Sequence, residues 1–189
     1  MSTTTDVKRP VLGGLEEMAV MRKVVGLVCL FMFVLSSVCL AKQVDHIYHD
    51  DHVLEPSEVA IGGVYVGMSE EDLHAVYGEP ASETEYKPDY LVGGQSKTVK
   101  YGDSFSIVIN DGYVLDLSSN ARNGLQMPSG IQVGDIKAKI LPTYGKPMRY
   151  WENSKTHSSN FVYRTSGGVH LRFEVIGGAI TLISIIGYE

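Results

Sequence analysis

The residues best suited to metal chemistry lie in the stretch DHIYHDDH, where His46, His49 and His52 recur at every third position with three aspartates among them. Imidazole nitrogens and carboxylate oxygens are ligands that zinc, nickel and copper accept. The spacing matches no closed structural zinc site. The sequence therefore leaves two interpretations open: capture of a metal ion by the three histidines, or a flexible polar spacer.

Motifs for catalysis are weaker. The stretch GGQSKT, residues 93–98, partly resembles a phosphate-binding loop, but Ser96 stands where that motif requires a glycine. The other histidines, His74, His157 and His170, have no nucleophile paired with them in the sequence, and no Gly-x-Ser-x-Gly motif occurs. We therefore expect a protein that is not an enzyme and uses no cofactor, with a triad assembled only by the fold as the alternative.

The N-terminal segment 1–41 is typical of a leader rather than of a folded domain. Arg22 and Lys23 precede an apolar run from Val24 to Val38, and Ala41 is followed by polar residues. This is the pattern of a secretory signal peptide at 21–41. We expect cleavage after Ala41 and an exported mature chain, located in the periplasm, in the cell envelope or outside the cell.

Two alternatives remain for the same segment. The apolar run extended to Ala41 is close to the length that spans a bilayer, so an uncleaved membrane anchor is one alternative. Lipidation of Cys39 is the other, although the residues before Cys39 match a bacterial lipobox poorly. Both cysteines, Cys29 and Cys39, lie in the leader, so we expect a mature chain without disulfides or thiol nucleophiles.

One sequence pattern occurs twice, as VGMSEEDLHAVYGEP from Val66 and as VGDIKAKILPTYGKP from Val133, with the matching residues in the same register throughout. A fixed offset of this kind predicts tandem structural units. The recurring residues to which we assign a structural role are Gly67, Tyr77, Gly78 and Pro80 in the first copy and Gly134, Tyr144, Gly145 and Pro147 in the second.

Each copy predicts a short helix. Ser69 and Asp135 are residue types that cap helix N-termini, whereas Gly78 and Gly145 suit a helix C-terminus and the prolines after them prevent continuation. The residues that we expect to face inward are Leu73, Val76 and Tyr77 in the first helix and Ile136, Ile140 and Tyr144 in the second.

Alternating apolar residues after each helix predict antiparallel strands joined by glycine turns. The apolar positions are Phe105, Ile107 and Ile109 in the first copy and Leu171, Phe173 and Val175 in the second. We therefore expect an α+β fold of two tandem units, in which a short helix or helix pair packs on a three- to four-stranded antiparallel sheet. The units would cover residues 61–120 and 130–189, after a polar His/Asp-rich spacer at 42–60 and with a linker at 121–129.

The doubled helix phrase resembles the helix signature of the BamE/SmpA/OmlA family of small outer-membrane lipoprotein domains. Its tandem occurrence is similar to the two-unit architecture of the β-lactamase inhibitory protein family, over about residues 61–189. The resemblance implies an exported, non-catalytic module that binds another protein, either in envelope assembly or as an inhibitor of a secreted hydrolase such as a β-lactamase. The chain departs from the inhibitor branch by lacking cysteines in the two units, and from the lipoprotein branch by its poor lipobox.

Charge differs between the two units. Residues 62–120 contain ten acidic and three basic side chains, a net charge of −7, whereas residues 130–189 contain four acidic and seven basic side chains, a net charge of +3. Opposite charges favour docking of one unit against the other or a dipolar surface that orients a partner, although ordinary solvated faces explain them equally well. The expected mature chain, 42–189, has 12 basic and 19 acidic side chains, and this net charge of −7 argues against nucleic acid as a partner.

Aromatic side chains gather at strand starts and in the loops after each helix. Tyrosine and tryptophan anchor interfaces because they bury a large area while freezing few rotors. The partner-binding residues that we predict are Tyr86, Tyr90, Tyr101, Tyr150, Trp151 and Tyr163, together with His170 and Arg172. The leading hypothesis is thus a protein-binding module that uses the open face of its sheets, with hydrolase inhibition and metal binding by the histidine-rich spacer as alternatives.

Overall fold

The computed structural model describes residues 45–47 and 53–187, which all lie in the compact unit that runs from Gln43 to Glu189. The predicted leader at 1–41, with its signal peptide and both cysteines, lies outside the described residues. In the described part of the chain, no helix is long and apolar enough to cross a membrane.

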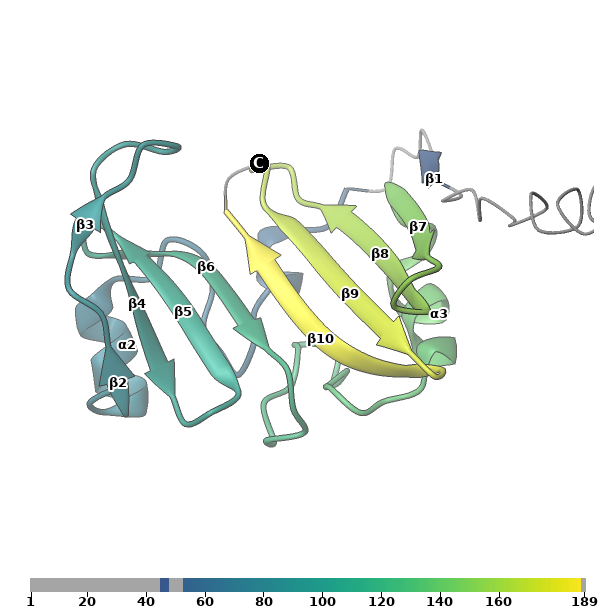
Figure 1. Ribbon diagram of the computed structural model, residues 1–189, viewed down its shortest axis with the longest axis horizontal. Helices are drawn as coiled ribbons and strands as arrows, with labels where there is room; N and C mark the ends of the chain where they lie inside the picture. The colour runs from purple at the N-terminus through teal and green to yellow at the C-terminus, as the bar shows by residue number, and fades with distance from the viewer. Residues whose placement is uncertain (1–44, 48–52, 188–189) are drawn as a thin grey trace, which may run out of the picture. The chain divides into compact units, whose positions relative to one another are not determined.

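The strands form one 10-stranded sheet in which neighbouring strands run antiparallel, in the order β1-β7-β8-β9-β10-β6-β5-β4-β2, with β3 paired to β4. The strands are β1 (Asp45–Ile47), β2 (Ser82–Glu83), β3 (Lys87–Pro88), β4 (Gln95–Tyr101), β5 (Phe105–Asn110), β6 (Tyr113–Ser119), β7 (Arg149–Asn153), β8 (Ser158–Arg164), β9 (His170–Ile176) and β10 (Ala179–Ile186). The helices are η1 (Pro56–Glu58), α2 (Glu70–Tyr77), η2 (Lys137–Lys139) and α3 (Ile140–Tyr144). Figure 1 shows α2 and α3 behind the sheet, on the same side of it. The α+β class predicted from the sequence is therefore confirmed.

Helix α2 follows from its local sequence. The Ser69 hydroxyl accepts a hydrogen bond from the Asp72 backbone N–H at 3.1 Å, and the acidic residues of the first turn complement the positive end of the helix dipole. Gly78 ends the helix at φ 72° and ψ −158°, a conformation that is open almost only to glycine. Leu73 is fully buried, but Val76, which we expected to face inward, is 62% exposed.

The second copy forms a shorter helix. Pro142 and Gly145 confine α3 to a little more than one turn, and the turn before it is the 3-10 helix η2. Asp135 does not cap either helix, which corrects the prediction. Its carboxylate instead accepts the Gln132 backbone N–H at 3.3 Å and pairs with Lys139 at 3.1 Å. Ile136, also expected inside, is 60% exposed.

We call α2 with β2 to β6 the first half and α3 with β7 to β10 the second half. Matched backbone hydrogen bonds join the start of the repeated motif to the sheet in both halves. Gly67 N–H donates to the Val114 carbonyl at 2.8 Å, and Gly134 N–H donates to the Ile180 carbonyl at 2.8 Å. Both glycines have φ 91°, a value that side chains with a Cβ rarely adopt. Both copies of the motif therefore need glycine at this position for the same reason.

Matched tyrosines secure the ends of the two helices. The Tyr101 hydroxyl donates to the Gly78 carbonyl at 3.1 Å, and the Tyr163 hydroxyl donates to the Gly145 carbonyl at 3.0 Å. Each of these rings also packs against the last tyrosine of its helix, with centroids 5.2 Å apart in the first half and 5.5 Å apart in the second. The carbonyl that each helix end leaves unpaired is thus satisfied by a strand residue.

The two halves share one sheet and one core. Strand β10 pairs with β6 over Ile183 to Ile186, and Ile185 lies opposite Leu117 at this seam. Both side chains belong to a single buried hydrophobic cluster that extends through both halves. Each half does follow the order helix then antiparallel meander, but the expected arrangement of two separate tandem units is not confirmed.

Residues outside the predicted units also enter the core. Leu54 and Val59, from the expected polar spacer, and Met127, from the expected linker, are buried in the same cluster. Strand β1 lies within the expected spacer too, and its backbone pairs with β7 so that Asp45 faces Trp151. These apolar residues stand in short stretches rich in polar residues, and composition alone assigned them to spacer and linker.

Candidate functional site

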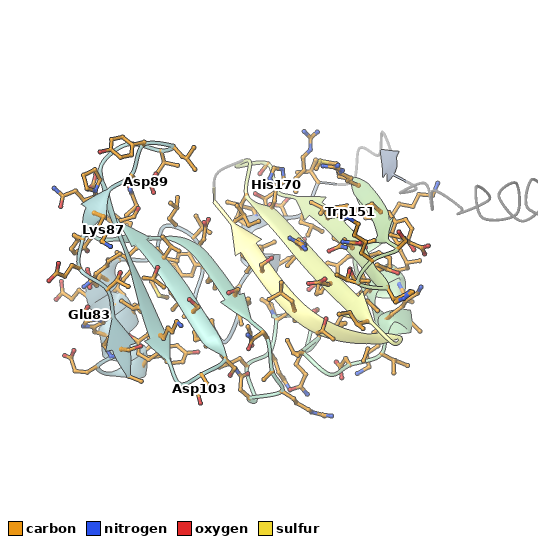
Figure 2. The ribbon with its side chains drawn as sticks, in the orientation of Figure 1. Glu83, Lys87, Asp89, Asp103, Trp151 and His170 are labelled. Carbon is orange, nitrogen blue, oxygen red and sulfur yellow. The ribbon has the colours of Figure 1, made fainter. Side chains whose placement is uncertain are left out.

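The candidate site lies on the sheet face that points away from α2 and α3. Along β9, Leu171, Phe173 and Val175 are buried beneath the helices, while the alternate residues point to the opposite, open face. Figure 2 shows the labelled side chains Trp151 and His170 on the part of this sheet formed by β7 to β10. Period-two alternation in the sequence thus separates a packing face from a face that can meet a partner.

Trp151 lies on the open face in the second half, on β7, next to the edge strand β1. The Arg149 Cζ lies 4.9 Å and the Arg172 Cζ 5.6 Å from the centroid of the Trp151 ring. Both distances are within the range in which a guanidinium is attracted by an indole ring. The arrangement is an indole ring with two guanidinium groups over it.

Polar side chains hold this arrangement in place. Arg172 donates through Nε to the Asn160 Oδ1 at 3.0 Å and lies 3.9 Å from the Glu174 carboxylate. Asn160 is buried and donates through Nδ2 to the Ser158 hydroxyl at 3.4 Å. Because Arg172 is fixed by these contacts, little rotamer entropy remains to be lost when a partner binds. We name Trp151, Arg149, Arg172, Asn160 and Glu174 the tryptophan patch.

Of the eight predicted partner-binding residues, the structure brings Trp151, His170 and Arg172 to the same open face. Tyr101, Tyr150 and Tyr163 lie on the opposite face, against the helices. Tyr163 is 1% exposed, and the Tyr150 ring packs on Phe161 with centroids 4.9 Å apart. The single aromatic surface expected from the sequence is therefore not formed by these three tyrosines.

The other two tyrosines lie at the far end of the first half. Tyr90 is 92% exposed in the loop after β3. The Tyr86 hydroxyl donates to Glu70 at 2.9 Å, and the Lys97 ammonium lies 4.9 Å from the centre of the Tyr86 ring. Tyr86 therefore takes part in a local charged network rather than in the tryptophan patch.

That network ties α2 to the sheet. The Lys97 ammonium lies 2.7 Å from a carboxylate oxygen of Glu70 in α2 and 2.7 Å from one of Glu83 in β2. Burial disfavours the charge of Lys97, but its hydrogen bonds to the two carboxylates outweigh burial and raise the Lys97 pKa. Burial likewise opposes ionisation of Glu70, yet Lys97 and Tyr86 keep the Glu70 pKa below its usual value. The cluster is a structural clamp at neutral pH.

Asp116 is a residue that the sequence analysis missed. It lies in β6 with Val108 and Ile186 as its cross-strand neighbours, and its Oδ1 accepts the Gly187 N–H at 2.9 Å. Burial raises the pKa of the Asp116 carboxyl although the Gly187 hydrogen bond opposes that shift. Its sequence signal was weak, because a single aspartate inside an apolar strand resembles an ordinary polar alternate position.

The predicted metal site cannot be built from the described residues. His49 and His52 lie outside them, and only the backbone of His46 is described, in β1. Within residues 53–187, no cluster of three His, Cys, Asp or Glu side chains is arranged to hold a metal ion. The proposal of metal binding at His46, His49 and His52 therefore stays a prediction.

Comparisons with known proteins find distant structural likenesses. No protein-family model and no curated protein matches the chain. A cysteine-rich secretory protein from Staphylococcus aureus matches with a TM-score of 0.48 at 11% identity, over 70% of this chain and 46% of its own, so this chain spans less than half of that protein. A DUF4309 family protein from Bacillus subtilis matches with a TM-score of 0.37 at 15% identity, over 62% of this chain and 77% of its own.

A third solved structure, a candidate β-lactamase inhibitor protein from Streptococcus mutans, matches with a TM-score of 0.28 at 14% identity. The match covers 69% of this chain and 92% of that one. No BamE-type lipoprotein is among the three structures. The chain is similar to each of them only at a level that assigns it to no family.

Proposed function

We propose that this chain is an exported, non-catalytic module that binds another protein through the tryptophan patch. The observation that carries the proposal is the Trp151 ring on the open sheet face with two guanidinium groups over it. Tryptophan and arginine are the residue types that dominate binding energy in protein interfaces. A face that already holds them in fixed positions is well prepared for a partner.

The charges of the patch indicate the kind of partner surface. Arg149 and Arg172 project from the half of the chain whose net charge is +3. A partner that presents carboxylates around an exposed apolar group would complement both the arginines and the indole. Electrostatic attraction of this kind mainly raises the association rate and sets orientation.

The proposal includes the two halves as duplicated helix-and-sheet units of the BamE-like kind, joined edge to edge. Their matched glycines and tyrosine hydrogen bonds support a common origin for the halves. Joining two such units produces a wide open face on the side of the sheet that the helices leave uncovered. The proposed location is the periplasm, the cell envelope or the extracellular space, as the leader indicates.

Affinity capture from an envelope extract tests the proposal. We expect wild-type protein to recover a partner and Trp151→Ala to lose at least about tenfold of that recovery, the loss typical of an interface hot spot. Tyr90→Ala is the matched control, because Tyr90 is an exposed aromatic residue in the other half. Equal recovery by Trp151→Ala and wild type would refute the role of the patch.

Two further measurements sharpen the result. Trp151 is the only tryptophan, so its fluorescence emission should shift when a captured partner is added back. Assays of β-lactamase and other secreted hydrolases in the presence of the protein would separate inhibition from envelope assembly. Tyr163→Ala is unsuitable for this purpose, because a buried Tyr163 makes that variant a test of folding.

A further inference from the structure

An apolar groove lies on the other side of the sheet, between α3 and the strands β7 and β8. Its volume is about 440 Å³, and its lining is Lys137, Ala138, Leu141, Lys146, Pro147, Tyr150 and Phe161. Phe161 and Pro147 are buried at its floor, whereas Leu141 is 51% exposed at its rim. This size and this composition, apolar walls with a few charged groups, are typical of sites for small ligands.

The corresponding place in the first half holds the Lys97 ion-pair cluster. The register of the doubled motif aligns Lys137 with Glu70 and, continued along the chain, Tyr150 with Glu83. The sheet register agrees, because Glu83 lies opposite Val99 as Tyr150 lies opposite Phe161. In the first half, Lys97 lies 2.7 Å from Glu70 of α2 and 2.7 Å from Glu83 of β2, and so links the helix to the strand.

The second half keeps the location but changes all three residues, with one reversal of charge and two neutral replacements. Lys137 stands where the first half has the acidic Glu70. Ser159 stands two residues before Phe161, as Lys97 stands two residues before Val99, so Ser159 corresponds to Lys97. No ion pair links Lys137 to another residue in the described part of the chain. The clamp of the first half thus has an internal cation for its carboxylates. In the groove of the second half, Lys137 has no carboxylate partner among the described residues, and the one carboxylate bonded to the lining, that of Glu152, accepts the Tyr150 hydroxyl.

We propose that this groove binds a small anionic amphiphile, a carboxylate carried on an unbranched alkyl chain. The alkyl chain would lie against Leu141, Pro147 and Phe161, where it removes apolar surface from water. The carboxylate would pair with Lys137, in the role that Glu70 plays toward Lys97 in the first half. The site is on the opposite sheet face from the tryptophan patch, so it is independent of the proposed protein-binding function.

Isothermal titration of the full chain with dodecanoate, below its micellar concentration, tests the proposal. We expect saturable 1:1 binding, and Lys137→Glu should weaken it about tenfold, because attraction to the carboxylate becomes repulsion. Lys155→Glu is the matched control, since it makes the same charge change at an exposed lysine in the turn between β7 and β8. Dodecanol and dodecyltrimethylammonium should bind more weakly than dodecanoate.

A second variant guards against misfolding of the first. Leu141→Glu changes a half-exposed rim residue of α3 and should abolish dodecanoate binding while circular dichroism stays that of the wild type. Absence of saturable binding, equal affinity in Lys137→Glu, or equal affinity for dodecanol would each overturn the proposal. Concentration-dependent self-association that Lys137→Glu abolishes, without dodecanoate binding, would also overturn it by assigning the groove to a second copy of the chain.

Discussion

The shared core makes a strong prediction about how the two halves unfold. Leu73 in α2 is fully buried in the first half, and Trp151 in β7 belongs to the second half. If the continuous sheet couples the halves, a cavity at Leu73 must lower the stability that is measured at Trp151. Independent units would leave the transition at Trp151 unchanged.

The size of the effect follows from burial. Replacement of a fully buried leucine by alanine costs about 3 kcal/mol in lost transfer energy and residual cavity. For a domain of this size, 1 kcal/mol shifts Tm by roughly 3 °C. Leu73→Ala should therefore lower Tm by about 9 °C, by the same amount in Trp151 fluorescence and in far-ultraviolet circular dichroism.

The control is Leu91→Ala, the same chemical change at a side chain that is 83% exposed in the same half. It should change stability by no more than about 0.5 kcal/mol. If Trp151 fluorescence of the Leu73→Ala variant changed at the wild-type Tm while circular dichroism showed an earlier unfolding step, the coupling through β6 and β10 would be refuted. That result would restore the interpretation of two separate units.

Three further predictions concern single groups. Burial raises the Asp116 pKa, so ionisation of this carboxyl opposes folding as pH rises above 3.8. Asp116→Asn should therefore unfold at a higher urea concentration than wild type at pH 7, and this gain in stability should vanish below pH 3.8. Glu70 has a lowered pKa, so its contribution to the free energy of unfolding is present above pH 4.5 and is lost as pH falls through the folded-state pKa. Glu70→Gln should lower the free energy of unfolding by about 1 kcal/mol in urea melts at pH 7. A deficit that stays constant down to pH 2 would contradict the clamp. Gly145 has φ 72° and ψ −155°, so Gly145→Ala should lower the free energy of unfolding by about 1–3 kcal/mol. The control Ser154→Ala, in an exposed turn, should leave stability unchanged. Equal stability of the two variants in thermal melts would show that alanine meets no strain at this helix end.

Local sequence was sufficient for helix α2 and for the alternating strands β5 and β9. The cap at Ser69 and the glycine at Gly78 act within one or two turns of the chain, so their chemistry is decided by near neighbours. Alternation likewise predicted which residues of β5 and β9 share a face. Asp135 shows where such reasoning fails, because a nearby turn N–H and Lys139 compete for the same carboxylate.

The candidate site was only partly predictable for a related reason. Alternation tells which residues lie on the same side of one strand, but it does not tell which side the helices cover. Tyr150 and Trp151 are neighbours in β7 and therefore point to opposite faces, one into the groove and one into the tryptophan patch. The Arg172 contact to Trp151 crosses from β9 to β7, a distance in sequence over which no local pattern carries information.

The sequence by itself thus determined the α+β class, the doubled helix motif and the places where glycine is required, because these depend on interactions between residues close in the chain. Tertiary structure alone decided that β6 joins β10 and that Leu54, Val59 and Met127 complete a common core. It also decided that the equivalent place between helix and strand holds the Lys97 clamp in the first half and the apolar groove in the second. The physical reason is that strand pairing and burial are settled by the total apolar surface removed from water, which depends on segments far apart in the chain.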